Sequence, residues 1–147
     1  MFEKLKHLFA ATPSVTTLPP ADAEHALGAL LVRAAKADDT YLFEELHQID
    51  KILVAQFGMN PVEAAKFRAS CEKLEEQMPD TVELAGILQR AIPLDQREAC
   101  VAALWSVVFA DGVEHEAEDI LLHQIETTLG IDPDTARRLH DAEQARH

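Results

Sequence analysis

The chain has 147 residues, 48% of them hydrophobic, which is the usual size of one domain with a buried core. Its formal net charge of -13 at pH 7 argues against a nucleic-acid partner, because binding to a phosphate backbone needs clustered lysine and arginine. Cations or a basic protein surface suit so acidic a chain better. The two cysteines, Cys71 and Cys100, are expected to be reduced, buried and structural.

Residues 1–9 predict a short amphipathic arm. One side carries Phe2, Leu5, Leu8 and Phe9, and the other carries Glu3, Lys4, Lys6 and His7. No long apolar run follows, so the arm is not a signal peptide, and no other segment approaches membrane-spanning length. The arm is expected either to pack on the domain as a lid or to make a weak contact with a membrane surface or a partner.

Residues 10–22 are rich in proline and threonine and predict a linker, which leaves a helical domain at residues 23–147. Apolar periodicity and cap signals predict seven helices there, at 23–36, 41–56, 61–78, 81–91, 95–109, 114–129 and 133–144. In the first helix, Ala26, Ala29, Leu30 and Ala34 repeat at helical spacing. The apolar run 101–109 predicts a helix buried nearly all round, with Trp105 in the core. Asn60, Asp80 and Asp132 are expected to cap helices.

An internal repeat organises these helices. The triplet Ala37-Asp38-Asp39 is matched by Ala110-Asp111-Gly112, and FGMNP at 57–61 is matched by LGIDP at 129–133. Each copy is expected to form helix, acidic turn, helix, Gly-x-[Asn/Asp]-Pro and helix. We therefore predict an all-α, bundle-like domain of about seven helices with two similar three-helix halves, plus the short N-terminal helix.

The acidic turns have two interpretations. In the first, Asp39 and Gly112 leave the preceding helix through the left-handed region, and Asp38 and Asp111 each accept a backbone N–H near the next helix. In the second, four carboxylates surround a hard divalent cation of the calcium or magnesium class. These four candidate ligands are Asp38, Glu45, Asp111 and Glu118.

The spacing around Asp111 excludes a true EF-hand, because Val107 and Phe109 occupy the earlier ligand positions and cannot coordinate a metal. The copies also differ in length, since Asp38 to Gly58 spans 20 residues (58 minus 38) and Asp111 to Gly130 spans 19. One copy therefore has an additional residue in its second helix. Glu45 matches Glu118 only if that residue falls after Glu45.

Other combinations of side chains are weaker candidates. His115, Asp119 and His123 stand four apart, as zinc ligands on one helical face can, but the segment is rich in solvated charge and predicts surface residues. Glu44-x-x-His47 is half of a di-iron motif without a second half. The chain has no Gly-rich phosphate loop, nucleophile elbow or His-Glu-x-x-His, so we expect no enzymatic activity.

The triplet at 110–112, with Glu118 seven residues after Asp111 and then LGIDP at 129–133, resembles the tellurite-resistance TerB-like family. The resemblance covers about residues 23–142 and implies a small all-helical domain with duplicated halves. It also implies a non-enzymatic bacterial, cytoplasmic module of stress or metal-ion response, whose acidic turns meet cations. The alternative function is a protein-interaction scaffold that acts through its acidic face and N-terminal arm near the inner membrane surface.

Overall fold

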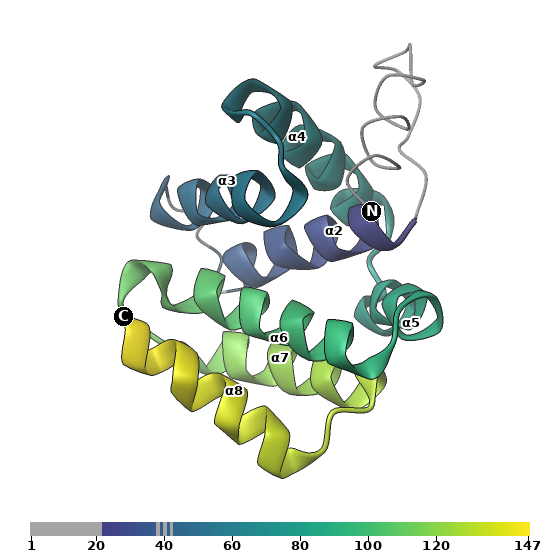
Figure 1. The fold of residues 1–147 in the computed structure, drawn as a ribbon, viewed down its shortest axis with the longest axis vertical. Coiled ribbons are helices and arrows are strands. Elements are labelled where there is room, and N and C mark those ends of the chain that lie inside the picture. The colour runs from purple at the N-terminus through teal and green to yellow at the C-terminus, as the bar shows by residue number, and fades with distance from the viewer. Residues whose placement is uncertain (1–21, 38, 40, 42) are drawn as a thin grey trace.

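The structure is a computed structural model of the chain, and it describes residues 22–37, 39, 41 and 43–147. The predicted arm at 1–9, the predicted linker up to residue 21, and Asp38 lie outside the described residues. The described part forms seven α-helices and one 3-10 turn (Figure 1). They are α2 (Ala23–Lys36), α3 (Phe43–Phe57), α4 (Pro61–Gln77), α5 (Thr81–Ala91), α6 (Leu94–Val108), η1 (Phe109–Asp111), α7 (Glu116–Leu129) and α8 (Pro133–Arg146).

These elements confirm the predicted all-α fold. The ranges of α2 and α5 agree with the prediction at both ends, whereas α3 and α7 each begin two residues later than predicted, at Phe43 and Glu116. The delay before α7 has a local cause, because His115 is extended, with φ -105° and ψ 150°. The helix therefore starts after His115 and not at Glu114. In the described ranges no helix is both long and apolar enough to cross a bilayer.

Backbone angles confirm the internal repeat, in which α2, α3 and α4 correspond to α6, α7 and α8. Asp39 has a φ of 66° and Gly112 a φ of 79°, so both acidic turns leave the preceding helix through the left-handed region. Gly58 and Gly130 match in the same way, with φ values of 65° and 74°. The substitution of aspartate for glycine at position 39 thus preserves the turn.

The register of the repeat follows from where the helices start. Each second helix starts four residues after its left-handed residue (43 minus 39 and 116 minus 112). Glu45 and Glu118 are each the third residue of their helix, so they are equivalent. Since α3 has 15 residues and α7 has 14, the additional residue of the first copy falls after Glu45.

Side-chain caps fix where several helices begin. Asn60 Oδ1 accepts from the Glu63 N–H at 2.8 Å while Glu63 Oε1 accepts from the Asn60 N–H at 2.9 Å, which is a complete capping box. Asp80 accepts from the Val82 N–H at 3.0 Å, and Asp132 accepts from the Thr135 N–H at 2.8 Å. The three predicted caps are confirmed. Asp22 caps α2 in the same manner, through the His25 N–H at 2.9 Å.

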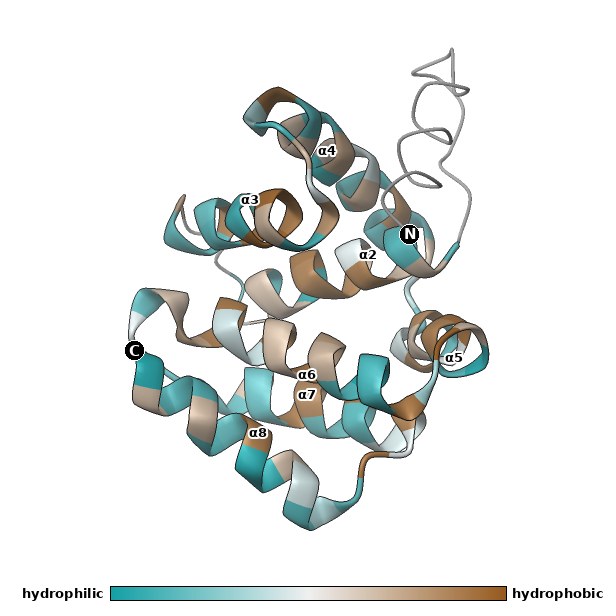
Figure 2. Ribbon diagram, viewed as in Figure 1, coloured by the Kyte–Doolittle hydropathy of each residue, from teal (hydrophilic) through white to brown (hydrophobic). Residues whose placement is uncertain are grey.

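Two helices form the centre of the molecule. α2 packs against α4, α5 and α6, and α6 also packs against α7 and α8. Residues 24–32 of α2 and residues 103–109 at the end of α6 are all buried. The burial of the second stretch was predicted, and α2 is buried on several sides because α4, α5 and α6 all pack against it. Figure 2 shows hydrophobic residues concentrated on these inner helices and a largely hydrophilic α8.

Arg33, on α2, joins three elements that are distant in sequence. Its guanidinium donates to the carbonyl oxygens of Glu75 (2.8 Å), Met78 and Pro79 (3.3 Å), to Thr81 Oγ1 (3.2 Å) and to Glu75 Oε2 (3.1 Å). The last carbonyls of a helix have no intrahelical partner, so Arg33 satisfies the end of α4 and connects it to the start of α5.

Both cysteines are buried and free, as predicted. Cys71, on α4, lies against Gly28 of α2 where the two helices cross, and a Cβ added at Gly28 would stand only 2.1 Å from Cys71 Sγ and 3.1 Å from Cys71 Cβ. Glycine at position 28 is therefore required by the close approach of two helices.

The substitution Gly28→Ala tests this contact. We expect it to lower the free energy of unfolding by about 1–3 kcal/mol, since overpacking at Cys71 outweighs the gain of about 1 kcal/mol in helix propensity. Gly86→Ala in α5 is the matched control, because its Cβ would meet only the flexible end of Arg90, at 3.1 Å, and should stabilise the protein. Urea denaturation measures both. Equal stability of the two variants would contradict the proposed contact.

Candidate cation-binding site at the duplicated turns

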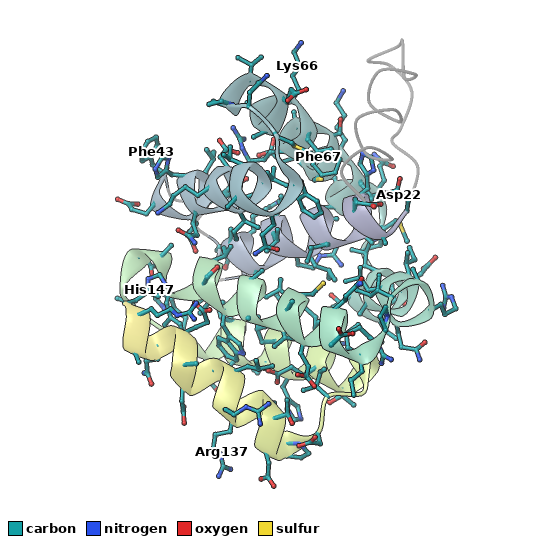
Figure 3. The ribbon with its side chains drawn as sticks, viewed as in Figure 1. Asp22, Phe43, Lys66, Phe67, Arg137 and His147 are labelled. Atoms are coloured by element: carbon teal, nitrogen blue, oxygen red, sulfur yellow. The ribbon has the colours of Figure 1, made fainter. Side chains whose placement is uncertain are left out.

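The start of α3, which follows the first acidic turn, and η1, which contains Asp111 of the second, lie on the same side of the molecule, the left in Figure 1. The end of α3 shares a pocket with the first half of α6, and Gln48 of α3 donates to Ser106 Oγ of α6 at 3.4 Å. The two helices are therefore antiparallel, which places the start of α3 beside the end of α6. Accordingly, α3 packs against η1, which contains Asp111. Phe43, the first residue of α3, is on this side in Figure 3.

Glu45 and Glu118 occupy equivalent positions and are both completely buried, at 0% exposure. Glu118 Oε1 accepts the His115 N–H at 2.9 Å, so one carboxylate oxygen of Glu118 binds the backbone just before α7. Removing a carboxylate from water costs several kcal/mol unless hydrogen bonds, an ion pair or a cation compensate. Glutamate is rarely buried completely in proteins, so two completely buried glutamates at equivalent positions are unusual.

Asp111 supports the turn itself. Its Oδ1 accepts from the Val113 N–H at 3.0 Å, and its Oδ2 lies 3.8 Å from His115 Nε2. The side chain of Asp111 is only 10% exposed. The predicted capping by Asp111 thus takes place within the turn and not at the first residues of α7.

The four predicted ligands are only partly placed. Asp111 and Glu118 both contact His115, and the helix of Glu45 packs on η1, whereas Asp38 lies outside the described residues. In the part of the chain that the structure describes, no three histidine, cysteine, aspartate or glutamate side chains are grouped to hold a metal ion. Glu45, Asp111 and Glu118, the three predicted ligands that the structure describes, are therefore not grouped as a metal-binding set.

The weaker combinations are also placed by the structure. His115, Asp119 and His123 form no metal-binding group, since none exists among the described residues. Asp119 and His123 are exposed, as the sequence predicted. His47 of the half di-iron motif stacks on Phe43, with ring centroids 5.8 Å apart.

A polar cluster between α6, α7 and α8 was not anticipated. His140 lies between Asp141 (Nδ1 to Oδ1, 2.8 Å) and Glu114 (Nε2 to Oε1, 2.9 Å). Its ring meets Trp105 edge-on, with centroids 4.6 Å apart. Trp105 Nε1 donates at 3.1 Å to Glu126 Oε2, an acceptor on α7. No sequence motif connects these residues, which come from α6, α7, α8 and the segment before α7.

The cluster perturbs the pKa of several groups. Partial desolvation, with the hydrogen bond to Glu114 and its charge, raises the pKa of Asp119 to about 6, although its side chain is largely exposed. Burial lowers the pKa of His140, but hydrogen bonds to Asp141 and Glu114 outweigh this and leave that pKa above its ordinary value. Burial raises the pKa of Glu126 against the opposing effect of the Trp105 hydrogen bond.

The fold and the two acidic turns together define a class of protein, the small all-helical domain with duplicated halves and an acidic turn in each. A family model described as tellurite resistance protein TerB matches residues 24–141. The match covers most of the chain, so the protein belongs to the TerB family. Neither a curated protein nor a solved structure matches the chain.

The only tryptophan of the chain, Trp105, reports on His140. A protonated imidazole quenches indole fluorescence, so emission should rise as pH increases through the raised pKa of His140, with a midpoint above about 6.5. Because this pKa is higher in the folded state, His140 contributes stability below pH about 6.5 and loses it as pH rises through the folded value. Asp141→Asn should lower the midpoint, and His140→Gln should remove the transition. An unchanged titration in His140→Gln would contradict the assignment.

Proposed function

We propose that this TerB protein is a non-enzymatic, cytoplasmic module of stress or metal-ion response that binds a hard divalent cation at its acidic turns. The observation that carries the proposal is the complete burial of Glu45 and Glu118 at equivalent corners. The proposed ligands are carboxylate oxygens of Asp38, Glu45, Asp111 and Glu118.

Charge and donor chemistry support this proposal. Calcium and magnesium prefer carboxylate oxygens, and a cation compensates the cost of burying negative charge. In a protein with a formal charge of -13, further repulsion from the surroundings raises that cost. At Asp111, Oδ1 already accepts the Val113 N–H, so Oδ2, which lies 3.8 Å from His115 Nε2, is the oxygen proposed to bind the cation.

Thermal unfolding with and without calcium, magnesium or manganese tests the proposal. A free cation concentration of one hundred times Kd stabilises a protein by about 2.7 kcal/mol, which in a domain of this size raises Tm by about 5–10 °C. Asp111→Asn and Glu118→Gln should abolish the rise. Both variants retain an acceptor oxygen for the Val113 and His115 N–H groups, so they remove charge while keeping the turn.

Asp132→Asn is the matched control, because it removes one exposed carboxylate and asparagine caps a helix equally well. Its Tm should still rise with cation. The proposal would be wrong if millimolar cation left the Tm of the unmodified protein unchanged. It would also be wrong if the rise survived in Glu118→Gln.

A protein-interaction scaffold near the inner membrane surface is the second candidate function. Large apolar side chains stand exposed at or near the starts of α3 and α7, close to the two turns, namely Phe43 (73%), Val113 (51%) and Ile120 (65%). Apolar groups within a charged surface are typical of sites where a partner docks. A basic partner would complement the surrounding carboxylates.

Deleting residues 1–20 tests the contribution of the arm to this second function. The shortened protein should be lost from the membrane or partner fraction while its helical circular dichroism is retained. The double variant Phe43→Ser and Ile120→Ser keeps the arm, so it tests the contribution of the acidic face alone. Unchanged co-purification of both altered proteins would count against the scaffold.

A further inference from the structure

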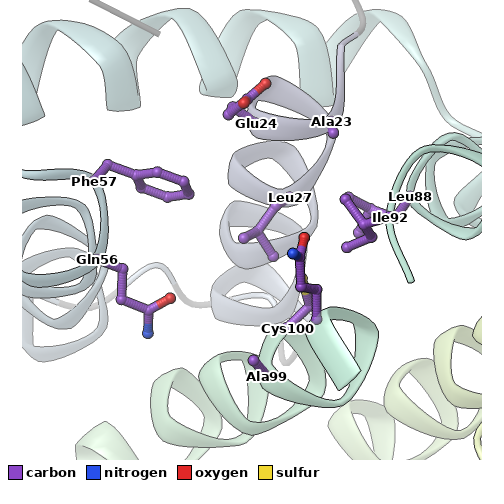
Figure 4. Close-up of a pocket in the computed structure, with 10 residues that line it drawn as sticks. Ala23, Glu24, Leu27, Gln56, Phe57, Leu88, Ile92, Ala99 and Cys100 are labelled. Atoms are coloured by element: carbon purple, nitrogen blue, oxygen red, sulfur yellow. The ribbon is translucent and has the colours of Figure 1, made fainter. Parts of the chain in front are cut away.

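An apolar pocket of about 180 Å³ lies at the opposite end of α2 and α3 from the acidic turns. Its walls are formed by Leu27, Phe57, Leu88, Ile92 and Cys100, which come from four helices (Figure 4). Polar groups occur among the lining residues only as Glu24, Gln56 and Gln96. A pocket with such walls favours an apolar side chain over water.

The internal repeat shows which element covers the place in the second half that corresponds to this pocket. There α5 packs against α7 and α2. Exchanging the equivalent helices, α7 for α3 and α2 for α6, moves this place to a groove between α3 and α6. The pocket is lined by the end of α3 and the first half of α6. Among the described helices, α5 has no counterpart in the first half.

The chain order indicates which segment is that counterpart. α5 directly precedes α6, and the segment that precedes α2 is residues 1–22. α5 buries Thr81, Leu84 and Leu88, a spacing of i, i+3 and i+7. Phe2, Leu5 and Phe9 repeat the same spacing.

Distance and charge are compatible with this assignment. The described chain begins at Asp22, and the next residue, Ala23, already lines the pocket. A linker from residue 10 to residue 22 reaches about 40 Å when extended, so the arm can return to the pocket, and its tether supplies an effective concentration in the millimolar range. Lys4 and Lys6 on the polar side of the arm complement Glu24 at the pocket.

We propose that residues 1–9 dock their apolar side in this pocket and take, in the first half, the place that α5 has in the second. This inference is independent of cation binding, since the pocket and the acidic turns are at opposite ends of α2 and α3.

Methyl-resolved NMR of the full chain tests the proposal. Nuclear Overhauser contacts are expected from the methyl groups of Leu5 and Leu8 to those of Leu27, Leu88 and Ile92. An isotope-filtered experiment on a mixture of labelled and unlabelled protein distinguishes the source. Contacts within one molecule support the proposal, whereas contacts only between molecules, or none at all, overturn it.

A pair of variants provides a second readout. Leu5→Ser with Leu8→Ser should shift the methyl resonances of Leu27, Leu88 and Ile92, while His7→Ser, on the polar side of the arm, should leave them unchanged. Equal effects of both changes would overturn the proposal. Anionic phosphatidylglycerol vesicles provide a further test. If adding them removed the NMR signals of the arm and left the pocket resonances unchanged, the arm would bind the membrane surface instead, and the proposal would be overturned.

Discussion

The packing of α2 against α6 is the contact on which the rest of the molecule depends. Both helices are buried along most of their length, and every other described helix packs against at least one of them. A fully buried leucine contributes about 2 kcal/mol relative to an exposed one, so Leu27, Leu30 and Leu31 of α2 together contribute about 6 kcal/mol. Neither half can therefore keep its core without the other, and the duplicated sequence forms one cooperative domain.

Features specified by neighbouring residues could be predicted from the sequence. The left-handed residues at 39 and 112, the prolines that start α4 and α8, and the caps at Asn60 and Asp132 all depend on interactions within a few positions. Local chemistry of this kind is independent of the tertiary structure. The repeat then extended these local signals to the whole fold, because the same turn had to be formed twice.

Features that depend on distant partners could not be predicted. Arg33 has the sequence context of a surface residue near the end of a helix, yet it binds groups more than 40 positions away. The cluster around His140 joins three helices in the same way. For the candidate site, the repeat left the equivalence of Glu45 and Glu118 conditional on where the additional residue falls, and the start of each helix was needed to establish it. Their complete burial depends on how the halves pack, and no pattern in either copy indicates it.

The additional residue in α3 has a consequence for how far the symmetry of the two halves extends. One inserted residue rotates everything downstream by about 100° and advances it by about 1.5 Å along the helix axis. The buried positions of the two helices keep the same spacing from Glu45 and Glu118 as far as Leu53 and Glu126. The offset therefore falls in the last turn, where the buried Phe57 of α3 stands one residue later than the buried Leu129 of α7. The correspondence of α3 and α7 is therefore lost only where α3 ends, beside the apolar pocket that Gln56 and Phe57 line.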